Sequence, residues 1–562
     1  MRLWLFRLIA LCIPLLLLFL LEALLRLLSL GQHTPLLLEN PAAPQYWVTN
    51  PAIINRYFPN PASRPNVQLE PSFVLKQKPP HGLRLVVQGG STAAGYPYGM
   101  GASLAGMLEQ RLRRTMPDRH IEVVNTALSA VNSYTLLDLS DEIIALQPDA
   151  VLIYAGHNEY LGLLGVGSSY VASQSIWLNR LLIQLRQLYL VQLLEQLLTP
   201  SASTDPSPST RTLMAQVARH KHIALDSPLY QAGLEQFSRN MTALLQNYAQ
   251  AGIPVYLATV ASNIADQPPF SSTALSAEEQ QQLKLVQAAE LQSPTTQQKL
   301  TRLSAQNSSS ADFHYQLGQL LRQAGLMQLA EHHLLRARDL DLLRFRAPSA
   351  INQRIRQLAQ EQQAVLVETE AAFRQHAADG LIGNSLMLEH LHPNPQGYFV
   401  LADSFYQALF RQQQIPGLTK AVPSGLSWLE RPLLPAEEHA GWLKIQQLLS
   451  DYPFKSQPEA VQFPAPQNEE QAWALAYVQG KMDWLGMIQR SAALYHQQKD
   501  GDMLVKALKI LADALPHDGQ VNYQAAAILQ QAGRKDEARF YLGRAEQSAN
   551  PPAAAALLRQ KL

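Results

Sequence analysis

The sequence predicts an α/β protein whose parallel sheet is covered by helices on both faces. Short apolar segments alternate with helical patterns through the middle of the chain. The segments are LRLVVQGG (83–90), IEVVNTALS (121–129), DAVLIYAG (149–156), IPVYLATVAS (253–262) and AVLVETEAAF (364–373). Strands that are separated by helices such as SLAGMLEQRLRRTM need right-handed crossovers, and these place the strands parallel in one sheet.

Length and composition indicate a large globular protein with more than one folded unit. The chain has 562 residues, whereas single hydrophobic cores stop growing at roughly 250 to 300 residues. Its net charge of +1 provides no basic surface for a phosphate backbone, so no nucleic acid partner is expected. The single cysteine, Cys12, lies in the most apolar stretch, which excludes an intrachain disulfide and a cysteine-ligated zinc.

Residues 1–31 are predicted to form a transmembrane signal anchor. From residue 8 to 30 the only charged residues are Glu22 and Arg26, which can pair on one helix face, and a helix of this length spans about 35 Å. A cleaved signal peptide is the alternative, but no small-x-small cleavage site follows the apolar run. Arg2 and Arg7 precede that run, so we expect a single-pass protein of the bacterial inner membrane with its folded part on the periplasmic or extracellular side.

The Pro-, Asn- and Gln-rich residues 32–80 are expected to form an extended stalk or a strap on the domain that follows. That α/β domain covers residues 81–415, with insertions at 160–225 and 264–345. The first insertion contains a very apolar helical pattern at 174–199, followed by TPSASTDPSPST, which is expected to be flexible. We expect the apolar helix to pack on its own domain; contact with the membrane or with an acyl chain is the alternative.

The second insertion resembles one tetratricopeptide repeat at about 311–341. Small and apolar residues occupy the positions where two antiparallel helices press together, namely Gly318, Gly325, Ala330, Leu334 and Ala337. After a linker with a helix at 416–470, residues 471–562 repeat the same scheme. Such repeats usually bind a protein or peptide on a concave face, and bracing of the α/β domain is the equally open alternative.

Polar residues follow several of the predicted strands. Ligands of an open parallel sheet bind beyond the carboxyl ends of its strands. Ser91 follows the first strand in GGST, Ala130 follows the second in NTALSAVNS, and Asn158 follows the third in AGHNEY. Near the end of the domain, LEHLHPNPQGY supplies Glu389 and His392 ahead of a helix.

Taken together and in chain order, these motifs resemble those of the SGNH (GDSL-type) hydrolase family. The resemblance covers about 81–415 without the insertions, and it implies a flavodoxin-like three-layer fold with a serine nucleophile. By this likeness Ser91 is the nucleophile, His392 the base and Glu389, in place of the family aspartate, its partner. The backbone N–H groups of Ser91 and Ala130 and the side chain of Asn158 are the implied oxyanion donors.

Several positions depart from the family pattern. Gly90 stands where the GDS motif has aspartate, Ala130 replaces the oxyanion glycine, and Glu159 replaces an aspartate. A backbone N–H survives the exchange of glycine for alanine, although the Cβ atom narrows the approach. His390 is the rival base, and the His-x-His pair could suggest a metal site, but too few further ligands converge for one to be expected.

The expected activity is that of a serine esterase that cleaves an O-acyl ester of a glycan or lipid through an acyl-Ser91 intermediate. No cofactor and no metal are expected. The same residues could instead pass the acyl group to a sugar hydroxyl, as an O-acyltransferase does. A third possibility is a catalytically silent scaffold, which the substitutions at Gly90, Ala130, Glu159 and Glu389 would favour.

Overall fold

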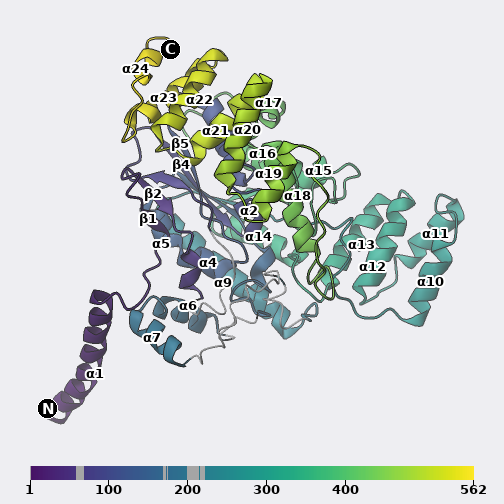
Figure 1. The fold of residues 1–562 in the computed structure, drawn as a ribbon. Coiled ribbons are helices and arrows are strands. Elements are labelled where there is room, and N and C mark those ends of the chain that lie inside the picture. Colours follow the sequence, from purple (N-terminus) through teal and green to yellow (C-terminus); the bar gives the residue numbers. More distant parts are fainter. Residues whose placement is uncertain (1, 59–68, 169–172, 174, 199–213, 215–221) are drawn as a thin grey trace.

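The computed structural model describes residues 2–58, 69–168, 173, 175–198, 214 and 222–562 (Figure 1). Its central sheet has five parallel strands in the order β5-β4-β6-β7-β8. Their bounds are β4 (Leu83–Gly89), β5 (Ile121–Asn125), β6 (Ala150–Tyr154), β7 (Val255–Ala258) and β8 (Val365–Val367). The predicted α/β class is therefore confirmed. Every residue of β4, β5, β6 and β7 is buried, which accounts for the continuous apolar runs.

Helices cover the sheet in two separate groups. On one side α3 (Leu104–Thr115) packs against α16 (Pro395–Gln412), and α15 (Thr369–His376) packs against α16. On the other side α9 (Pro228–Gln250) contacts α4 (Ser133–Asp138), α5 (Ser140–Ala145) and α14 (Ser349–Glu361). The short α2 (Ser91–Ala94) and the 3-10 turn η3 (His157–Glu159) follow β4 and β6 at the carboxyl edge of the sheet. The result is three layers around one large core.

Residues 32–58 and 69–80 pack on the α/β domain through a second, antiparallel sheet. Its strands are β1 (Leu37–Glu39), β2 (Tyr46–Thr49) and β3 (Phe73–Leu75), with η1 (Ile53–Arg56) after β2. Leu75 donates its N–H to Glu122 at 2.9 Å and accepts from Arg84 at 2.7 Å, so β3 is tied to the edge of the main sheet. The sequence left open whether this segment is an extended stalk or a strap. Its described part lies on the α/β domain, as a strap would.

The first insertion contains two helices where the pattern predicts one. They are α6 (Ile176–Leu185) and α7 (Tyr189–Leu198), and the chain turns between them. The expected flexible stretch TPSASTDPSPST lies outside the described residues. The N-terminal α1 (Arg2–Leu27) extends away from the body and packs only its last turns against α7 (Figure 1). Its window Ala10–Leu27 is long and apolar enough to cross a membrane.

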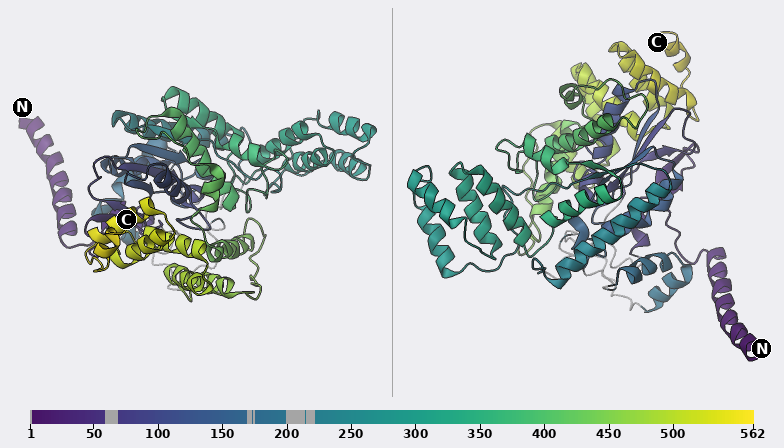
Figure 2. Two further views of the ribbon diagram at one scale, coloured as in Figure 1. Left: turned by 90° about the horizontal axis from the view of Figure 1, so that it is seen from above. Right: turned by 180° about the vertical axis from the view of Figure 1, so that it is seen from behind.

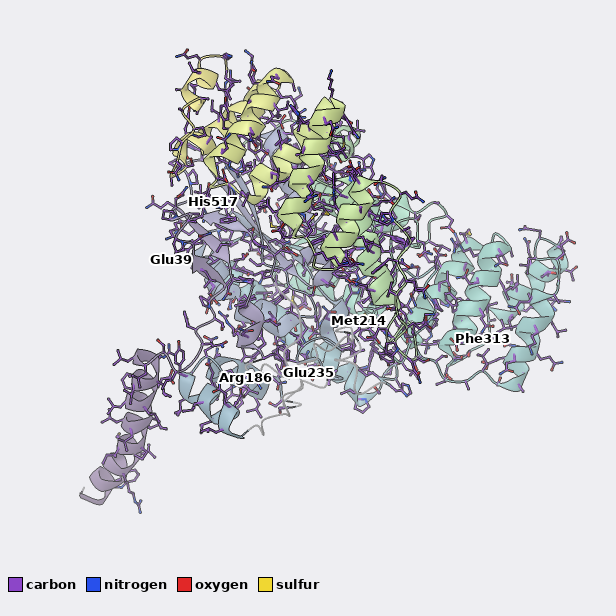
Figure 3. All side chains as sticks on the ribbon, viewed as in Figure 1. Glu39, Arg186, Met214, Glu235, Phe313 and His517 are labelled. Carbon is purple, nitrogen blue, oxygen red and sulfur yellow. The ribbon has the colours of Figure 1, made fainter. Side chains whose placement is uncertain are left out.

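The second insertion projects from the body as a group of antiparallel helices. These are α10 (Ala277–Gln287), α11 (Pro294–Leu303), α12 (Ala311–Gln323) and α13 (Met327–Leu340). Phe313 on α12 lies well away from the main sheet in Figure 3. Arg322 ties α12 to the body through ion pairs with Asp266 at 2.8 Å and Asp379 at 2.6 Å. The helical hairpin predicted at about 311–341 is present as α12 and α13; its kinship with tetratricopeptide repeats stays a prediction.

The C-terminal helices form a separate layer with hydrophobic clusters of their own. They are α17 (Ser424–Leu429), α18 (Pro435–Leu449), α19 (Glu469–Val478), α20 (Trp484–Gln498), α21 (Gly501–Ala514), α22 (Gly519–Gln531), α23 (Lys535–Gln547) and α24 (Ala555–Arg559). In Figure 2 this layer lies along the α/β domain rather than projecting from it. Arg113 of α3 pairs with Asp513, and Arg114 pairs with Glu537 at 2.9 Å. These ion pairs join the C-terminal helices to α3 of the α/β domain.

Candidate active site

Ser91 lies at the carboxyl end of the central strand β4. The strand ends at Gly89, Gly90 is extended, and Ser91 begins α2. As the first residue of a helix, Ser91 has a backbone N–H without an intrahelical acceptor. The side chain is partly accessible to solvent, so the hydroxyl and the free N–H are both available at this edge of the sheet.

His392 and Glu389 approach Ser91 from the loop before α16. The distance between Nε2 of His392 and Oγ of Ser91 is 2.7 Å. On the other side of the ring, Nδ1 of His392 contacts Oε1 of Glu389. Ser91 and His392 lie 301 residues apart in sequence, and together with Glu389 their side chains form one continuous hydrogen-bonded chain.

The loop that carries Glu389 and His392 is fixed by its own backbone. Leu388 donates to the carbonyl of His392 at 2.8 Å, and Asn394 donates to that of Leu386 at 3.0 Å. The Asn394 side chain then caps α16 by accepting from Gly397 N–H at 2.9 Å, with Pro395 at the first helical position. The sequence HPNPQG therefore ends the loop and starts the helix at a defined place, which holds the imidazole in position.

Glu389 is buried and uses both carboxylate oxygens. Oε1 accepts from the His392 backbone N–H at 2.8 Å, and Oε2 accepts from that of His390 at 2.7 Å. The side chain is 1% exposed. The turn of the loop folds the long side chain of Glu389 back onto its own backbone, and this places the carboxylate beside Nδ1 of His392.

The environment of His392 keeps the imidazole neutral. Burial lowers the pKa of His392 below its ordinary value, because a buried imidazolium loses its hydration. The ring of Tyr96 packs 4.8 Å from the His392 ring, and Tyr96 is itself held by Tyr398, whose hydroxyl donates to the Tyr96 carbonyl at 2.6 Å. A neutral imidazole next to a serine hydroxyl can act as a general base.

Ala130 lies in the loop after β5, and Asn158 lies in η3 after β6. Ala130 has a φ of 62°, in the left-handed region that favours glycine, and its carbonyl accepts from Leu163 N–H at 2.8 Å. Asn158 donates one amide hydrogen to the Val131 carbonyl at 3.0 Å, which leaves the second available. Each of the sequence-predicted oxyanion donors is therefore at the edge of the sheet where Ser91 lies.

Gly90 explains how the Asn158 amide fits. A Cβ atom at position 90 would lie 2.9 Å from Nδ2 of Asn158. The aspartate of the family motif could not occupy this position unless Asn158 moved. Gly90 thus leaves space for the Asn158 side chain, and Ala130 presents its backbone in a left-handed conformation.

Glu159 is hydrogen-bonded to the start of α4, directly after the loop that carries Ala130. It accepts from Ser133 Oγ at 2.7 Å, from Ser133 N–H at 3.2 Å and from Gln236 at 2.6 Å. Burial raises the pKa of Glu159 to about 7. The sequence singled out Glu159 only as a family substitution; its partner Gln236 lies 77 residues away, on α9, and no local pattern indicates the contact.

His390 does not face Ser91. Its ring packs against Phe270 at 5.3 Å, Phe345 at 6.2 Å and Phe454 at 5.4 Å, while Nδ1 contacts Oε2 of Glu389. His392, and not its rival, is the imidazole next to the serine. Over the described part of the chain, no group of three or more His, Cys, Asp or Glu side chains is arranged to hold a metal ion.

Comparison with known proteins gives only distant likenesses. No family model and no curated protein matches the chain. Among solved structures, it is similar to a protein described as a GDSL-like lipase of Parabacteroides merdae, with 11% identity, a TM-score of 0.30, and coverage of 59% of this chain and 98% of that one.

Two further likenesses are of the same order. For the acetyl xylan esterase AlAXEase the identity is 14% and the TM-score 0.28, with coverage of 58% and 100%. For the esterase EstA of a Pseudoalteromonas species the identity is 11% and the TM-score 0.26, with coverage of 59% of this chain and 98% of that one. Similarity at this level assigns no activity, so function has to be inferred from the geometry of the site.

Proposed function

We propose that this protein is a membrane-anchored serine ester hydrolase that cleaves an O-acyl ester through an acyl-Ser91 intermediate. The observation that supports this most is the 2.7 Å contact between Nε2 of His392 and Oγ of Ser91, with Glu389 on the opposite ring nitrogen. A serine, a neutral imidazole and a carboxylate in this order form the arrangement that activates a hydroxyl for acyl transfer.

The reaction has two halves. Oγ of Ser91 attacks the ester carbonyl while Nε2 of His392 takes its proton, and Glu389 holds the proton on Nδ1 and stabilises the imidazolium. The tetrahedral intermediate expels the alcohol, which receives the proton from His392. Water then attacks the acyl-Ser91 ester with His392 again as base, and the carboxylic acid leaves.

The oxyanion of each tetrahedral intermediate would be stabilised by the backbone N–H groups of Ser91 and Ala130 and by the free amide hydrogen of Asn158. Each donor of this kind contributes about 3 to 4 kcal/mol in the transition state. The left-handed backbone at Ala130 and the hydrogen bond from Asn158 to Val131 hold these groups in place before substrate binds. No metal or organic cofactor is required by these steps.

The protein would act outside the cytoplasm. The apolar helix α1 precedes the folded body, and Arg2 and Arg7 precede its apolar run, which favours a cytoplasmic N-terminus and a periplasmic or extracellular catalytic domain. We extend the proposal to the units 1–31 (anchor), 32–80 (strap), 81–415 (catalytic domain), 416–470 (linker) and 471–562 (helical repeats). An O-acyl ester of a glycan or lipid is the substrate class that suits this location, and the projecting helices α10–α13 offer room for a protein or peptide partner.

A fluorophosphonate probe and a set of p-nitrophenyl esters with short and long acyl chains test the proposal on the full-length protein. Wild type should be labelled and should hydrolyse at least one ester, whereas Ser91→Ala should do neither. Ser385→Ala, which removes an exposed hydroxyl from the loop before Glu389, is the matched control and should behave as wild type.

Folded wild-type protein that neither reacts with the probe nor hydrolyses any ester would contradict the proposal and favour the scaffold. Acyl release that accelerates with added sugar, without more free acid, would instead indicate transfer from the same acyl-Ser91 intermediate.

A further inference from the structure

The helices α6 and α7 carry an apolar face that the body does not cover. On α6 it consists of Trp177, Leu178 and Leu185, and on α7 of Leu194 and Leu197. Trp177 is 70% exposed and Leu197 is 73% exposed. Contiguous apolar surface of this kind is uncommon on soluble proteins and marks a contact with a partner or a membrane. We call these five side chains the apolar face.

The inner side of the two helices carries buried polar side chains beside buried apolar ones, while several large apolar side chains stay outside. Asn179 and Gln192 are among the buried residues, whereas tryptophan and leucine point outward. Asn179 donates to Tyr134 Oη at 3.2 Å and to the Ser173 carbonyl at 2.8 Å. The hairpin is thus fixed on its inner side by polar as well as apolar contacts, and the outward tryptophan and leucines stay exposed.

The hairpin is fixed to the last turns of α1. Glu22 of α1 accepts from the backbone N–H groups of Tyr189 at 3.1 Å and Leu190 at 2.8 Å, so it satisfies the free donors at the start of α7. Arg26 pairs with Glu22 at 2.7 Å, and its guanidinium lies 5.0 Å from the centre of the Tyr189 ring. Glu22 and Arg26, the two charged residues of the apolar run, thus join the end of α1 to the start of α7.

A second set of contacts closes the junction. Gln32 N–H donates to the Gln192 side chain at 2.8 Å, and Gln192 Nε2 donates back to the Gln32 carbonyl at 3.0 Å. A Cβ atom on Gly31 would lie 2.4 Å from the Tyr189 ring, so only glycine permits this approach. Figures 1 and 2 show α7 beside the inner end of α1, and Figure 3 places Arg186, between the two helices, there as well.

The exposed apolar side chains at the inner end of α1 and those of α7 therefore belong to two helices that pack against each other. Near the junction Leu24 is 48% exposed and Leu27 is 82% exposed. The last turns of α1 pack against α7, which exposes Leu194 and Leu197. A helix that crosses a bilayer ends at the level of the lipid headgroups, and whatever is bonded to its last turns lies at that level too. Tryptophan prefers this zone, and interfacial helices insert their apolar side about 5 to 10 Å into it.

We propose that α6 and α7 form an interfacial foot that inserts the apolar face into the outer leaflet of the membrane crossed by α1. This inference rests on the proposed anchoring by α1. The foot contacts lipid at the boundary between headgroups and acyl chains. It is held to the body by Asn179, which donates to Tyr134 Oη at 3.2 Å, and by Arg186, which donates to the Tyr57 carbonyl at 3.3 Å. The catalytic domain is thereby kept at a fixed orientation to the membrane.

Site-specific probes on the full-length protein test the foot. Because Cys12 is the sole cysteine, Cys12→Ser provides a background in which Leu197→Cys and Leu194→Cys each carry one environment-sensitive fluorophore. Lys535→Cys, on exposed α23 far from α1, is the matched control. The native Cys12, labelled in the unaltered chain, reports insertion of α1. Each protein is placed singly in nanodiscs of phosphatidylethanolamine and phosphatidylglycerol that contain nitroxide lipids.

The probes at 194 and 197 should shift their emission to the blue and lose fluorescence to a nitroxide near the headgroups more than to one deep in the acyl chains. The Lys535 probe should do neither. Quenching of the Cys12 probe without quenching at 194 and 197 would overturn the foot and leave the anchor standing. An unquenched Cys12 probe would overturn both the anchor and the foot, while fluorophosphonate labelling of the same samples reports the esterase separately. If the blue shift at 197 appears only when a disc holds two copies of the protein, the apolar face contacts a second copy of the chain and not lipid. That result would also overturn the proposal.

Discussion

The two sides of Ser91 are built in different ways. On the proton-transfer side, His392 and Glu389 are buried side chains with several hydrogen-bond partners each. On the oxyanion side, the left-handed backbone at Ala130, the absence of a side chain at Gly90 and one hydrogen bond from Asn158 set the geometry. The proton-transfer side depends on the chemical nature of its side chains. The oxyanion side depends on the space around Asn158 and on the backbone conformation at Ala130.

Under the proposed mechanism, this difference accounts for the residues that differ from the SGNH motifs which the sequence resembles. A carboxylate is needed next to His392, and Glu389 supplies one because its loop folds back to bond both oxygens. A backbone N–H is needed at position 130, and alanine supplies it as well as glycine does. Substitutions on the proton-transfer side should therefore nearly abolish ester hydrolysis. Each substitution on the oxyanion side should lower kcat only in part.

The largest effect is expected from Glu389→Gln. The substitution preserves size but removes the charge that holds the Nδ1 proton and stabilises the imidazolium, so kcat should fall by about 10⁴-fold with KM little changed. Steady-state hydrolysis of a p-nitrophenyl ester measures it, with Glu368→Gln on the distant pair with Arg356 as the control. A loss of less than tenfold would mean that the two sides of Ser91 do not differ as described.

A smaller loss is expected from Asn158→Ala. It removes one oxyanion donor and leaves the proton-transfer side intact, so kcat should fall by about 10² to 10³-fold. Fluorophosphonate labelling should slow while remaining confined to Ser91. Loss as complete as that of Ser91→Ala would show that Asn158 does more than donate one hydrogen bond.

The pH profile tests the proton-transfer side. Burial lowers the pKa of His392, so the neutral base should persist, and log(kcat/KM) should stay level, to pH values below the ordinary histidine range near 6.5. Below the lowered pKa the rate should fall about tenfold per pH unit. Glu389→Gln removes the anion that favours the imidazolium and should move this acid limb to still lower pH. An acid limb centred above 6.5 would contradict the stated effect of burial.

The smallest effect is expected from Ala130→Gly on the oxyanion side. Glycine relieves the left-handed strain at this position, partly offset by a more flexible unfolded chain, so the free energy of unfolding should rise by about 0.5 to 1 kcal/mol. Chemical denaturation measures this change. Activity toward bulky acyl groups should also rise relative to acetyl esters, because the Cβ atom is gone. A decrease in stability would contradict the conformation described for Ala130.

The sheet could be predicted because its strands are buried on both faces. LRLVVQGG, DAVLIYAG and their counterparts are continuous apolar runs, and four of the five strands are buried along their whole length. The small sheet of β1, β2 and β3 was missed because it lies in a proline-rich segment and each strand has only three or four residues. Its stability depends on Arg84 and Glu122 in the main sheet, which no local pattern indicates.

The break between α6 and α7 could not be predicted for the same reason. Residues 174–199 have continuous helical periodicity, and the donors at the start of α7 are satisfied by Glu22, which lies 167 residues earlier. In the site, chain order pointed to Ser91, Asn158, Glu389 and His392, since each stands at the end of a predicted strand or ahead of a helix. The supporting residues Gln236 and Phe454 come from distant segments, and the contact of Tyr96 with His392 joins residues far apart in sequence, so only the folded chain reveals these contacts.

The most direct test of the central claim is mass-spectrometric identification of the residue that a fluorophosphonate modifies in the full-length protein. A single adduct is expected, on Ser91, that forms rapidly in wild type and is lost or greatly slowed in His392→Ala. An adduct on another serine, or one on Ser91 that forms equally fast without His392, would contradict it.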